Sequence, residues 1–312
     1  MLYITTRQNR DVYTAVKALN DVQTPDEGLY VPYSLPVFDQ QQLAQITACS
    51  FGETVAHILN LFFPGQLTGW DVDVVAGRSP LKLIGVARKT VMVQTWHNPG
   101  YSFDYVLESI YDKLDGAQQT QPKGWAVIAI RIAYLFAAYG ELLRQGLISP
   151  EHGFNISVSV GDFTELVSAF YARSMGLSVD KIIICSDESS ALWDLIHRDE
   201  LNTSLLKPEQ KRDMERLIYC VLGHDEVEAY KAACDRHGVY LIPEEKCQAF
   251  AAFSFGAVIG KNRIGSVISS VSQLNGVMLT PVTAVCYAGV QDFRSKTGQS
   301  NLTVLFAHHN RT

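Results

Sequence analysis

The sequence lacks the short motifs that identify the commonest nucleotide-binding and hydrolytic enzymes. No two of its 22 glycines are separated by a single residue, so the G-x-G-x-x-G fingerprint of dinucleotide-binding enzymes does not occur. The segment GAVIGKN (256–262) has a spacing one residue too short for a P-loop, and no serine or threonine follows Lys261. The G-x-S-x-G turn of the α/β-hydrolases is also absent. We therefore do not expect a dinucleotide-binding enzyme, a P-loop nucleotide-binding protein or an α/β-hydrolase.

Patterns for metal binding and disulfides are missing as well. The six cysteines are scattered without a C-x-x-C pair, and we expect buried free thiols in a reducing cytoplasm. None of the eight histidines shows the H-E-x-x-H spacing or a comparable one. His308 and His309 are adjacent near an expected strand end, where neighbouring side chains face opposite ways. The HDE run at 224–226 is typical of an acidic helix start. We expect no metal site.

The sequence also lacks a cluster of basic residues, an N-terminal signal peptide and a clear membrane-spanning segment. The chain has 26 Lys and Arg against 32 Asp and Glu, a net charge of −6, without the basic block that nucleic acid binding requires. The start MLYITTRQNRD lacks the apolar core of a signal peptide, which predicts a cytoplasmic location. Residues 125–143 are apolar and long enough to span a membrane, but Arg131 lies in their middle. We interpret them as a core helix, with no membrane partner.

The chain does contain a change of pattern near residue 88. We predict an N-terminal, mainly helical region (1–88), in which no period-2 strand pattern stands out, followed by an α/β domain (89–312). Near-continuous β-branched runs alternate there with helical stretches, which favours a mainly parallel sheet covered by helices. The expected strands are 90–95, 155–160, 181–185 and 302–307. The expected helices are 11–21, 40–47, 51–63, 103–114, 125–143, 163–175, 208–221, 226–236, 244–259, 263–274 and 282–296.

Five segments occur in the same order as segments of one enzyme family. They are TPDEGLYVP (24–32), WHNPGYSFDY (96–105), NISVSVGDFTELV (155–167), DMERLIYCVLG (213–223) and GVMLTPVTAV (276–285). Together they resemble threonine synthase, a pyridoxal-phosphate (PLP) enzyme with the tryptophan-synthase-β-like fold. The resemblance covers most of the chain and implies the larger lobe of that fold.

The resemblance also indicates which parts of the PLP chemistry have been lost. A PLP enzyme needs a lysine amine for the internal aldimine and a glycine-rich loop whose amides hold the phosphate. At the position of that lysine this sequence has Asp104, and the nearest lysines, Lys89 and Lys113, are at least nine residues away. The loop S-G-N-F-G of the family has become VGDFT (160–164), and the histidine of the P-H-T-A-V segment has become Val282. The resemblance therefore implies no catalytic PLP site.

A large deletion is expected beside this site. In threonine synthases a βαβ subdomain lies between the lysine motif and the long apolar helix. Here only the 19 residues 105–123 intervene, fewer than the roughly 30 of a βαβ unit. Most of the smaller lobe of the cleft therefore looks deleted. We expect the apolar surface uncovered by this loss to be covered by a partner or a second copy.

Several residues are left at the implied cleft. The candidates are His97, Asn98, Asp104, Gly161, Asp162 and Thr283. We interpret His97 as part of a turn after a strand, Asp104 as a carboxylate near a helix N-terminus, and Gly161 as a glycine that allows a tight strand-to-helix turn. Arg131 needs a partner in its apolar helix, and Asp104 or Asp162 is the candidate.

Three functions follow from these residues. The first is a threonine-synthase-like protein without catalytic activity or cofactor, which binds a small ligand or a protein partner and could form a homodimer. The second is an active PLP-dependent threonine synthase, converting O-phosphohomoserine to threonine, with a lysine from elsewhere in the fold or from a second subunit. The third is PLP-independent chemistry at His97, Asp104 and Asp162, because a histidine with two carboxylates can perform acid–base catalysis.

Overall fold

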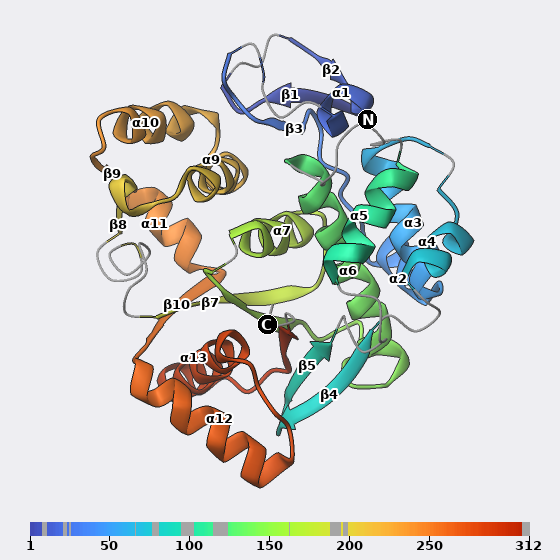
Figure 1. Ribbon diagram of the computed structural model, residues 1–312, viewed down its shortest axis with the longest axis vertical. Helices are drawn as coiled ribbons and strands as arrows, with labels where there is room; N and C mark the ends of the chain where they lie inside the picture. Colours follow the sequence, from blue (N-terminus) through green and yellow to red (C-terminus); the bar gives the residue numbers. More distant parts are fainter. Residues whose placement is uncertain are drawn as a thin grey trace. The chain divides into compact units, whose positions relative to one another are not determined.

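A computed structural model describes most of the chain. The described residues are 1–7, 11–20, 24, 26–65, 67–76, 81–94, 103–114, 124–161, 163–187, 195 and 199–307. They form two compact units that interleave along the sequence (Figure 1). Unit 1 comprises Met1–Lys82, Thr95–Glu151 and Val167–Ser178, and unit 2 comprises Leu83–Gln94, His152–Leu166 and Val179–Thr312. The division of the sequence at residue 88 stays a prediction.

Unit 1 begins with a small antiparallel sheet that the sequence patterns did not indicate. Strand β1 (Leu2–Thr5) pairs with β2 (Tyr13–Thr14) on one side and β3 (Tyr30–Pro32) on the other. No period-2 pattern in the sequence indicates these strands, and the prediction of a mainly helical region is not contradicted by them. These strands have two to four residues, too few to produce a period-2 pattern. Because β2 takes the first residues of the helix expected at 11–21, α1 is limited to Ala15–Asn20.

The rest of unit 1 is helical and is built around one apolar helix. The helices are α2 (Gln40–Ala48), α3 (Phe51–Phe62), α4 (Gly69–Ala76), α5 (Phe103–Lys113) and α6 (Trp125–Arg144). Capping boxes at Asp39 and Ser50 start α2 and α3. Helix α6 is long and apolar enough to cross a membrane, but 78% of its most apolar window is buried. The interpretation of this segment as a core helix is confirmed.

Unit 2 contains the predicted parallel sheet. Its strand order is β10-β7-β6-β11-β5-β4, and the four pairs from β10 to β5 are parallel. The strands are β4 (Lys82–Ala87), β5 (Thr90–Gln94), β6 (Phe154–Ser159), β7 (Val179–Asp187), β10 (Ser254–Ile259) and β11 (Thr303–Ala307). A two-residue turn, Arg88–Lys89, joins β4 to β5, so these neighbours form a hairpin.

Helices follow the strands of unit 2, and one pair covers a face of the sheet. Helix α7 (Phe163–Ser174) begins in unit 2 and continues into unit 1. The other helices are α9 (Pro208–Leu222), α10 (His224–Asp235), α11 (Glu244–Ala251), α12 (Lys261–Asn275) and α13 (Pro281–Thr297). Two short strands, β8 (Glu200–Asn202) and β9 (Val239–Leu241), pair antiparallel beside a 3₁₀ turn, Thr203–Leu205. Helices α12 and α13 pack side by side, and α13 contacts β6, β7, β10 and β11 (Figure 1).

One predicted helix was wrong. The stretch 244–259 divides into α11, which ends at Ala251, and strand β10, which begins at Ser254. Residues Phe255, Ala257 and Ile259 alternate along β10 and pack into the core formed with α13. A short apolar run can be either a strand or a buried helix segment, and here the neighbouring strand β7 decides the outcome.

Arg294 ties helix α13 to the β4–β5 turn. Its Nη1 donates to the carbonyl oxygen of Arg88 at 3.1 Å and to Oγ1 of Thr90 at 2.9 Å. Its Nη2 donates to the carbonyl oxygens of Lys89 at 2.6 Å and Asn301 at 3.4 Å. A planar guanidinium can reach these four acceptors together, whereas a lysine ammonium cannot match their arrangement.

We expect Arg294→Met to lower the free energy of unfolding by about 1–3 kcal/mol, because the acceptors lose charge-assisted hydrogen bonds. The free energy of unfolding of Arg294→Lys should lie between those of Arg294→Met and the wild type. Urea denaturation followed by circular dichroism measures the change. Arg236→Met is the matched control, since the Nε of Arg236 bonds only within its own helix region, to Ala232. Equal stability of the Met variant and the wild type would contradict this role.

Candidate functional site

The carboxyl ends of the parallel strands meet at one edge of the unit 2 sheet. In open α/β sheets ligands bind outside these ends. We call this edge, with the turns that follow it, the carboxyl edge. Its described residues include Ser159, Gly161, Ser186, Asp187, Gly260, Lys261, Thr280 and Thr283. Two of the predicted cleft residues, Gly161 and Thr283, therefore belong to the same edge.

The first turns of α13 are held over β6 and β7 by a buried polar cluster. Ser157 Oγ donates to the carbonyl oxygen of Cys286 at 3.0 Å and lies 3.2 Å from Cys185 Sγ. The hydrogen bond with Cys185 and burial both raise the pKa of the Cys286 thiol well above its ordinary value. Because a nucleophilic cysteine needs a lowered pKa, this thiol is a structural group.

Thr283 is engaged in the start of its own helix. Thr280 is the N-cap of α13, and its Oγ1 accepts the backbone N–H of Thr283 at 3.1 Å. The two threonine hydroxyls lie 2.9 Å apart, and Thr283 is fully buried. Pro281 occupies the first turn, where a missing N–H costs nothing. The described contacts of Thr283 therefore explain its presence as a capping residue.

Gly161 follows β6 in an ordinary backbone conformation. Its φ lies outside the left-handed range, and among the described residues a Cβ built on it would meet Ser159 Oγ, at 3.6 Å. The backbone N–H of Gly161 donates to the same Oγ at 3.3 Å. Because Asp162 lies outside the described residues, the interpretation that Gly161 allows a tight strand-to-helix turn stays a prediction.

The remaining cleft candidates cannot be assembled into a site. The side chains of His97, Asn98, Asp104, Asp162, His308 and His309 lie outside the described residues. The backbone of Asp104 lies in the first turn of α5, the predicted place near a helix N-terminus, in unit 1. Arg131 is half-buried in α6, and its pairing with Asp104 or Asp162 stays a prediction. Acid–base chemistry at His97, Asp104 and Asp162 also stays a prediction.

The structure describes all six cysteines and the HDE run at 224–226. All six cysteines are free, but only Cys185 and Cys286 are buried, so the expectation of burial was wrong for the other four. Within the described part of the chain, no group of three or more His, Cys, Asp and Glu is arranged to hold a metal. The HDE run does start helix α10, and Glu226 accepts a hydrogen bond from the Tyr240 hydroxyl at 2.9 Å.

The carboxyl edge does not fit PLP as the resemblance implies. That cofactor needs an amine beside the turn that holds its phosphate. Among the segments that directly follow the parallel strands, only 260–263 contains a lysine, Lys261. It follows β10, which β7 separates from β6, so its backbone lies about 10 Å to the side of the Gly161 turn. Lys261 therefore follows a different strand from the Gly161 turn, and the described residues of that turn include no amine side chain.

Comparisons of sequence identify relatives for parts of this chain. Residues 2–79 match the family model described as threonine synthase N terminus. Threonine synthase-like 1 of Mus musculus is 31% identical over 111 residues, which cover 32% of this chain and 15% of the relative. Threonine synthase of Pseudomonas aeruginosa is 22% identical over 198 residues, covering 59% of this chain and 40% of the relative. The matches thus span less than half of each relative.

Solved structures share the fold over nearly the whole chain. The PLP-bound threonine synthase from Brucella melitensis superposes with a TM-score of 0.81 at 16% identity, covering 99% of this chain and 89% of that one. Threonine synthase from yeast gives a TM-score of 0.77 at 13% identity, with coverage of 98% and 86%. The N-terminal region of this chain thus matches the threonine synthase N terminus, and the chain as a whole shares the fold of threonine synthases.

Proposed function

We propose that this chain is a threonine-synthase-like protein that has lost PLP catalysis and acts by binding at its carboxyl edge. The observation that carries the proposal is Asp104, which stands in the first turn of α5 where the resemblance places the PLP lysine. A carboxylate cannot form a Schiff base with the cofactor aldehyde. Its charge also repels a phosphate group.

The turn after β6 supports the same proposal. A phosphate loop offers several backbone N–H groups, and small or neutral side chains leave them accessible. Here the Gly161 N–H already donates to Ser159, and Asp162 brings a second negative charge to the sequence of the turn. Two changes at different points of the chain thus act against an anionic cofactor.

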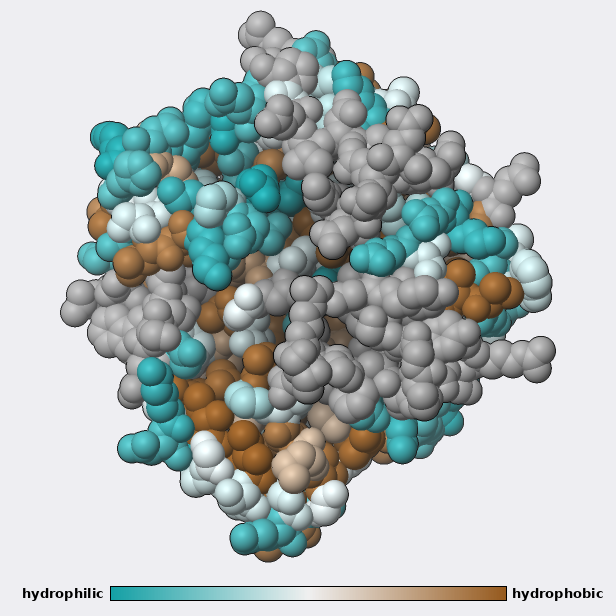
Figure 2. All heavy atoms as spheres, in the orientation of Figure 1, coloured by the Kyte–Doolittle hydropathy of each residue, from teal (hydrophilic) through white to brown (hydrophobic). Residues whose placement is uncertain are grey.

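An apolar rim supports binding of a small ligand or a protein partner. Leu274, Met278 and Val282, at the end of α12 and the start of α13, are exposed by 82%, 73% and 37%. The face drawn in Figure 2 carries hydrophobic surface in its lower part, where Figure 1 places α12 and α13. A homodimer, a cytoplasmic location and the lack of nucleic acid and membrane partners stay predictions from the sequence.

The alternative is an active PLP-dependent threonine synthase with a non-standard lysine. Lys261 favours this alternative, because it is the one lysine in a segment that directly follows a parallel strand. It is exposed at the first position of α12. A cofactor joined to it would have to lie at the β10 end of the sheet, away from the Gly161 turn.

Titration with PLP followed by borohydride reduction tests the proposal. We expect no stoichiometric increase in intact mass and no aldimine absorbance band, because the position that should carry the amine has a carboxylate. Scattered substoichiometric labelling of exposed lysines is compatible with this expectation. The Lys261→Met variant and Lys207→Met, an exposed control on α9, should give the same weak labelling as the wild type.

A single stoichiometric adduct would overturn the loss of PLP chemistry. If peptide mapping located it at Lys261, and Lys261→Met but not Lys207→Met abolished it, the alternative function would stand.

Replacement of Gly161 tests whether its turn serves binding or folding. Because its φ suits other residues and its Cβ position is open, Gly161→Ala should leave the unfolding free energy unchanged or raise it by about 0.4–1 kcal/mol. Gly289→Ala is the contrasting control, since its Cβ would lie 2.2 Å from Cys185 Sγ. We expect a loss of about 1–3 kcal/mol there. Thermal and urea denaturation measure both; a comparable loss for Gly161→Ala would show that the fold needs this glycine.

A further inference from the structure

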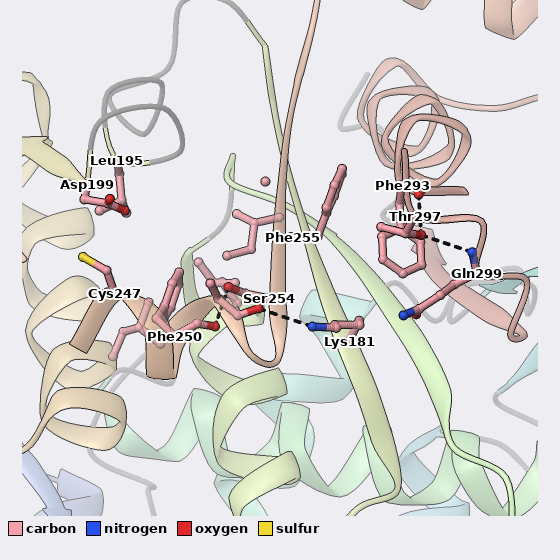
Figure 3. A pocket seen from close by; sticks show the side chains of 15 residues that line it. Lys181, Leu195, Asp199, Cys247, Phe250, Ser254, Phe255, Phe293, Thr297 and Gln299 are labelled. Carbon is pink, nitrogen blue, oxygen red and sulfur yellow. Dashed lines mark hydrogen bonds between the residues drawn. The ribbon is translucent and has the colours of Figure 1, made fainter. Parts of the chain in front are cut away.

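Unit 2 contains a pocket of about 430 Å³ that no part of the proposed function uses. It lies along the first half of β10, between the start of β7, helix α11 and the end of α13 (Figure 3). Its volume falls within the range of sites for small organic molecules. All of its lining residues belong to unit 2.

The pocket is separate from the carboxyl edge. It is lined by Lys181 on β7 and by Ser254, Phe255 and Gly256 on β10, near the amino ends of these strands. The carboxyl edge begins after Ile259, so Lys181 and the part of β10 that lines the pocket lie on the amino-terminal side of this edge.

Three phenylalanines line the pocket, Phe250 on one side of β10 and Phe255 with Phe293 on the other (Figure 3). Phe250 comes from α11, Phe255 from β10 and Phe293 from α13. The rings of Phe255 and Phe293 meet edge to face, with centroids 5.2 Å apart. Flat apolar groups pack well against such rings. The pocket therefore suits a ligand with an aromatic body.

The hydroxyl groups that line the pocket have already used their donors. Ser254 Oγ donates to the carbonyl oxygen of Phe250 at 2.7 Å, and Thr297 Oγ1 donates to that of Phe293 at 2.7 Å. Each hydroxyl has a single O–H group, so neither can donate to a ligand without breaking its bond. The donors for a ligand must come from other side chains.

Lys181 supplies such a donor together with a positive charge. In Figure 3 its side chain lies between the residues on the α11 side of β10 and those on the α13 side. Its Nζ donates to the carbonyl oxygens of Ala251, at 3.3 Å, and Ala252, which hold the ammonium in place. An ammonium has three N–H groups, so one remains after these two bonds. A second ammonium, that of Lys296, lies 5.7 Å from the ring centroid of Phe255.

The opposite charge limits how an anion can lie in the pocket. Asp199 is the single acidic residue of the described lining, and it lies beside Cys247 (Figure 3). Burial, and next the charge of Asp199, raise the pKa of the Cys247 thiol, which stays neutral. An anionic ligand group is therefore repelled from this side and attracted toward Lys181.

We propose that this pocket binds a small aromatic carboxylic acid, with its carboxylate on Lys181 and its ring against Phe250 on the α11 side of β10. A charge-assisted hydrogen bond fixes the carboxylate, and the buried ring supplies most of the apolar contact. The site is a second binding site, independent of whether the carboxyl edge has kept PLP chemistry.

Isothermal titration of the full chain with 3-phenylpropionate tests the proposal, with 2-phenylethylamine as the ligand of similar size and opposite charge. We expect binding of the acid and none of the amine. Lys181→Met should weaken binding of the acid about tenfold or more, because one charged hydrogen bond is lost. Lys181→Arg should retain most of the affinity, and the exposed control Lys207→Met should leave it unchanged.

Measurements on the wild type keep the test valid if Lys181→Met does not fold. Binding of the acid should weaken at high salt, because a partly exposed ammonium is screened. Equal binding of the amine, affinity that does not change with salt, or no binding of the acid would each overturn the proposal. An unchanged affinity in folded Lys181→Met would overturn it as well. None of these results depends on whether borohydride traps PLP on Lys261.

Discussion

The structure of unit 2 depends on the close approach of helix α13 to strands β6 and β7. Gly289 makes that approach possible, because any Cβ at this position would overlap Cys185 Sγ on β7. The hydrogen bond from Ser157 to the Cys286 carbonyl fixes the same contact on β6. Helix α13 has 17 residues and is about 25 Å long, so this contact in its middle fixes the positions of both helix ends relative to the sheet. One end carries Thr280 and Thr283 at the carboxyl edge, and the other carries Phe293 and Thr297 at the pocket.

The parts of this fold that could be predicted are those in which one local pattern coincides with one element. The run IIIC (182–185) is buried in a strand that has neighbours on both sides, and the apolar stretch from Trp125 forms one continuous core helix, so each pattern had a single outcome. The local pattern around Ser254 does not specify one element. Its apolar residues extend the helical pattern of α11, and it becomes a strand because it pairs with β7, which is far away in the sequence. The two-residue strand β2 is likewise defined by its neighbour β1 and not by its own residues.

The resemblance pointed to two residues that the structure places at the carboxyl edge. Thr283 is one of them, although the sequence TPVT by itself is a helix start with an N-cap threonine and a proline. Gly161 is the other; its φ is compatible with other residues, and its role in a tight turn stays a prediction. The pocket on β10 was missed, because Lys181, Phe250, Phe255 and Phe293 come from four separate elements. No spacing along the chain brings such residues together before the sheet order is known.

The same packing explains how this fold can be maintained independently of the chemistry at its carboxyl edge. The described residues of the carboxyl edge form hydrogen bonds that stabilise local structure, as Thr280 does for α13 and Ser159 for the turn after β6. The core that holds the sheet together lies between α13 and the strands and consists of hydrophobic side chains. A change of a polar side chain at the carboxyl edge would therefore leave the contacts of this core in place. Strand β10 runs from the pocket at its start to the carboxyl edge at its end, and these are the two places in unit 2 where binding is proposed.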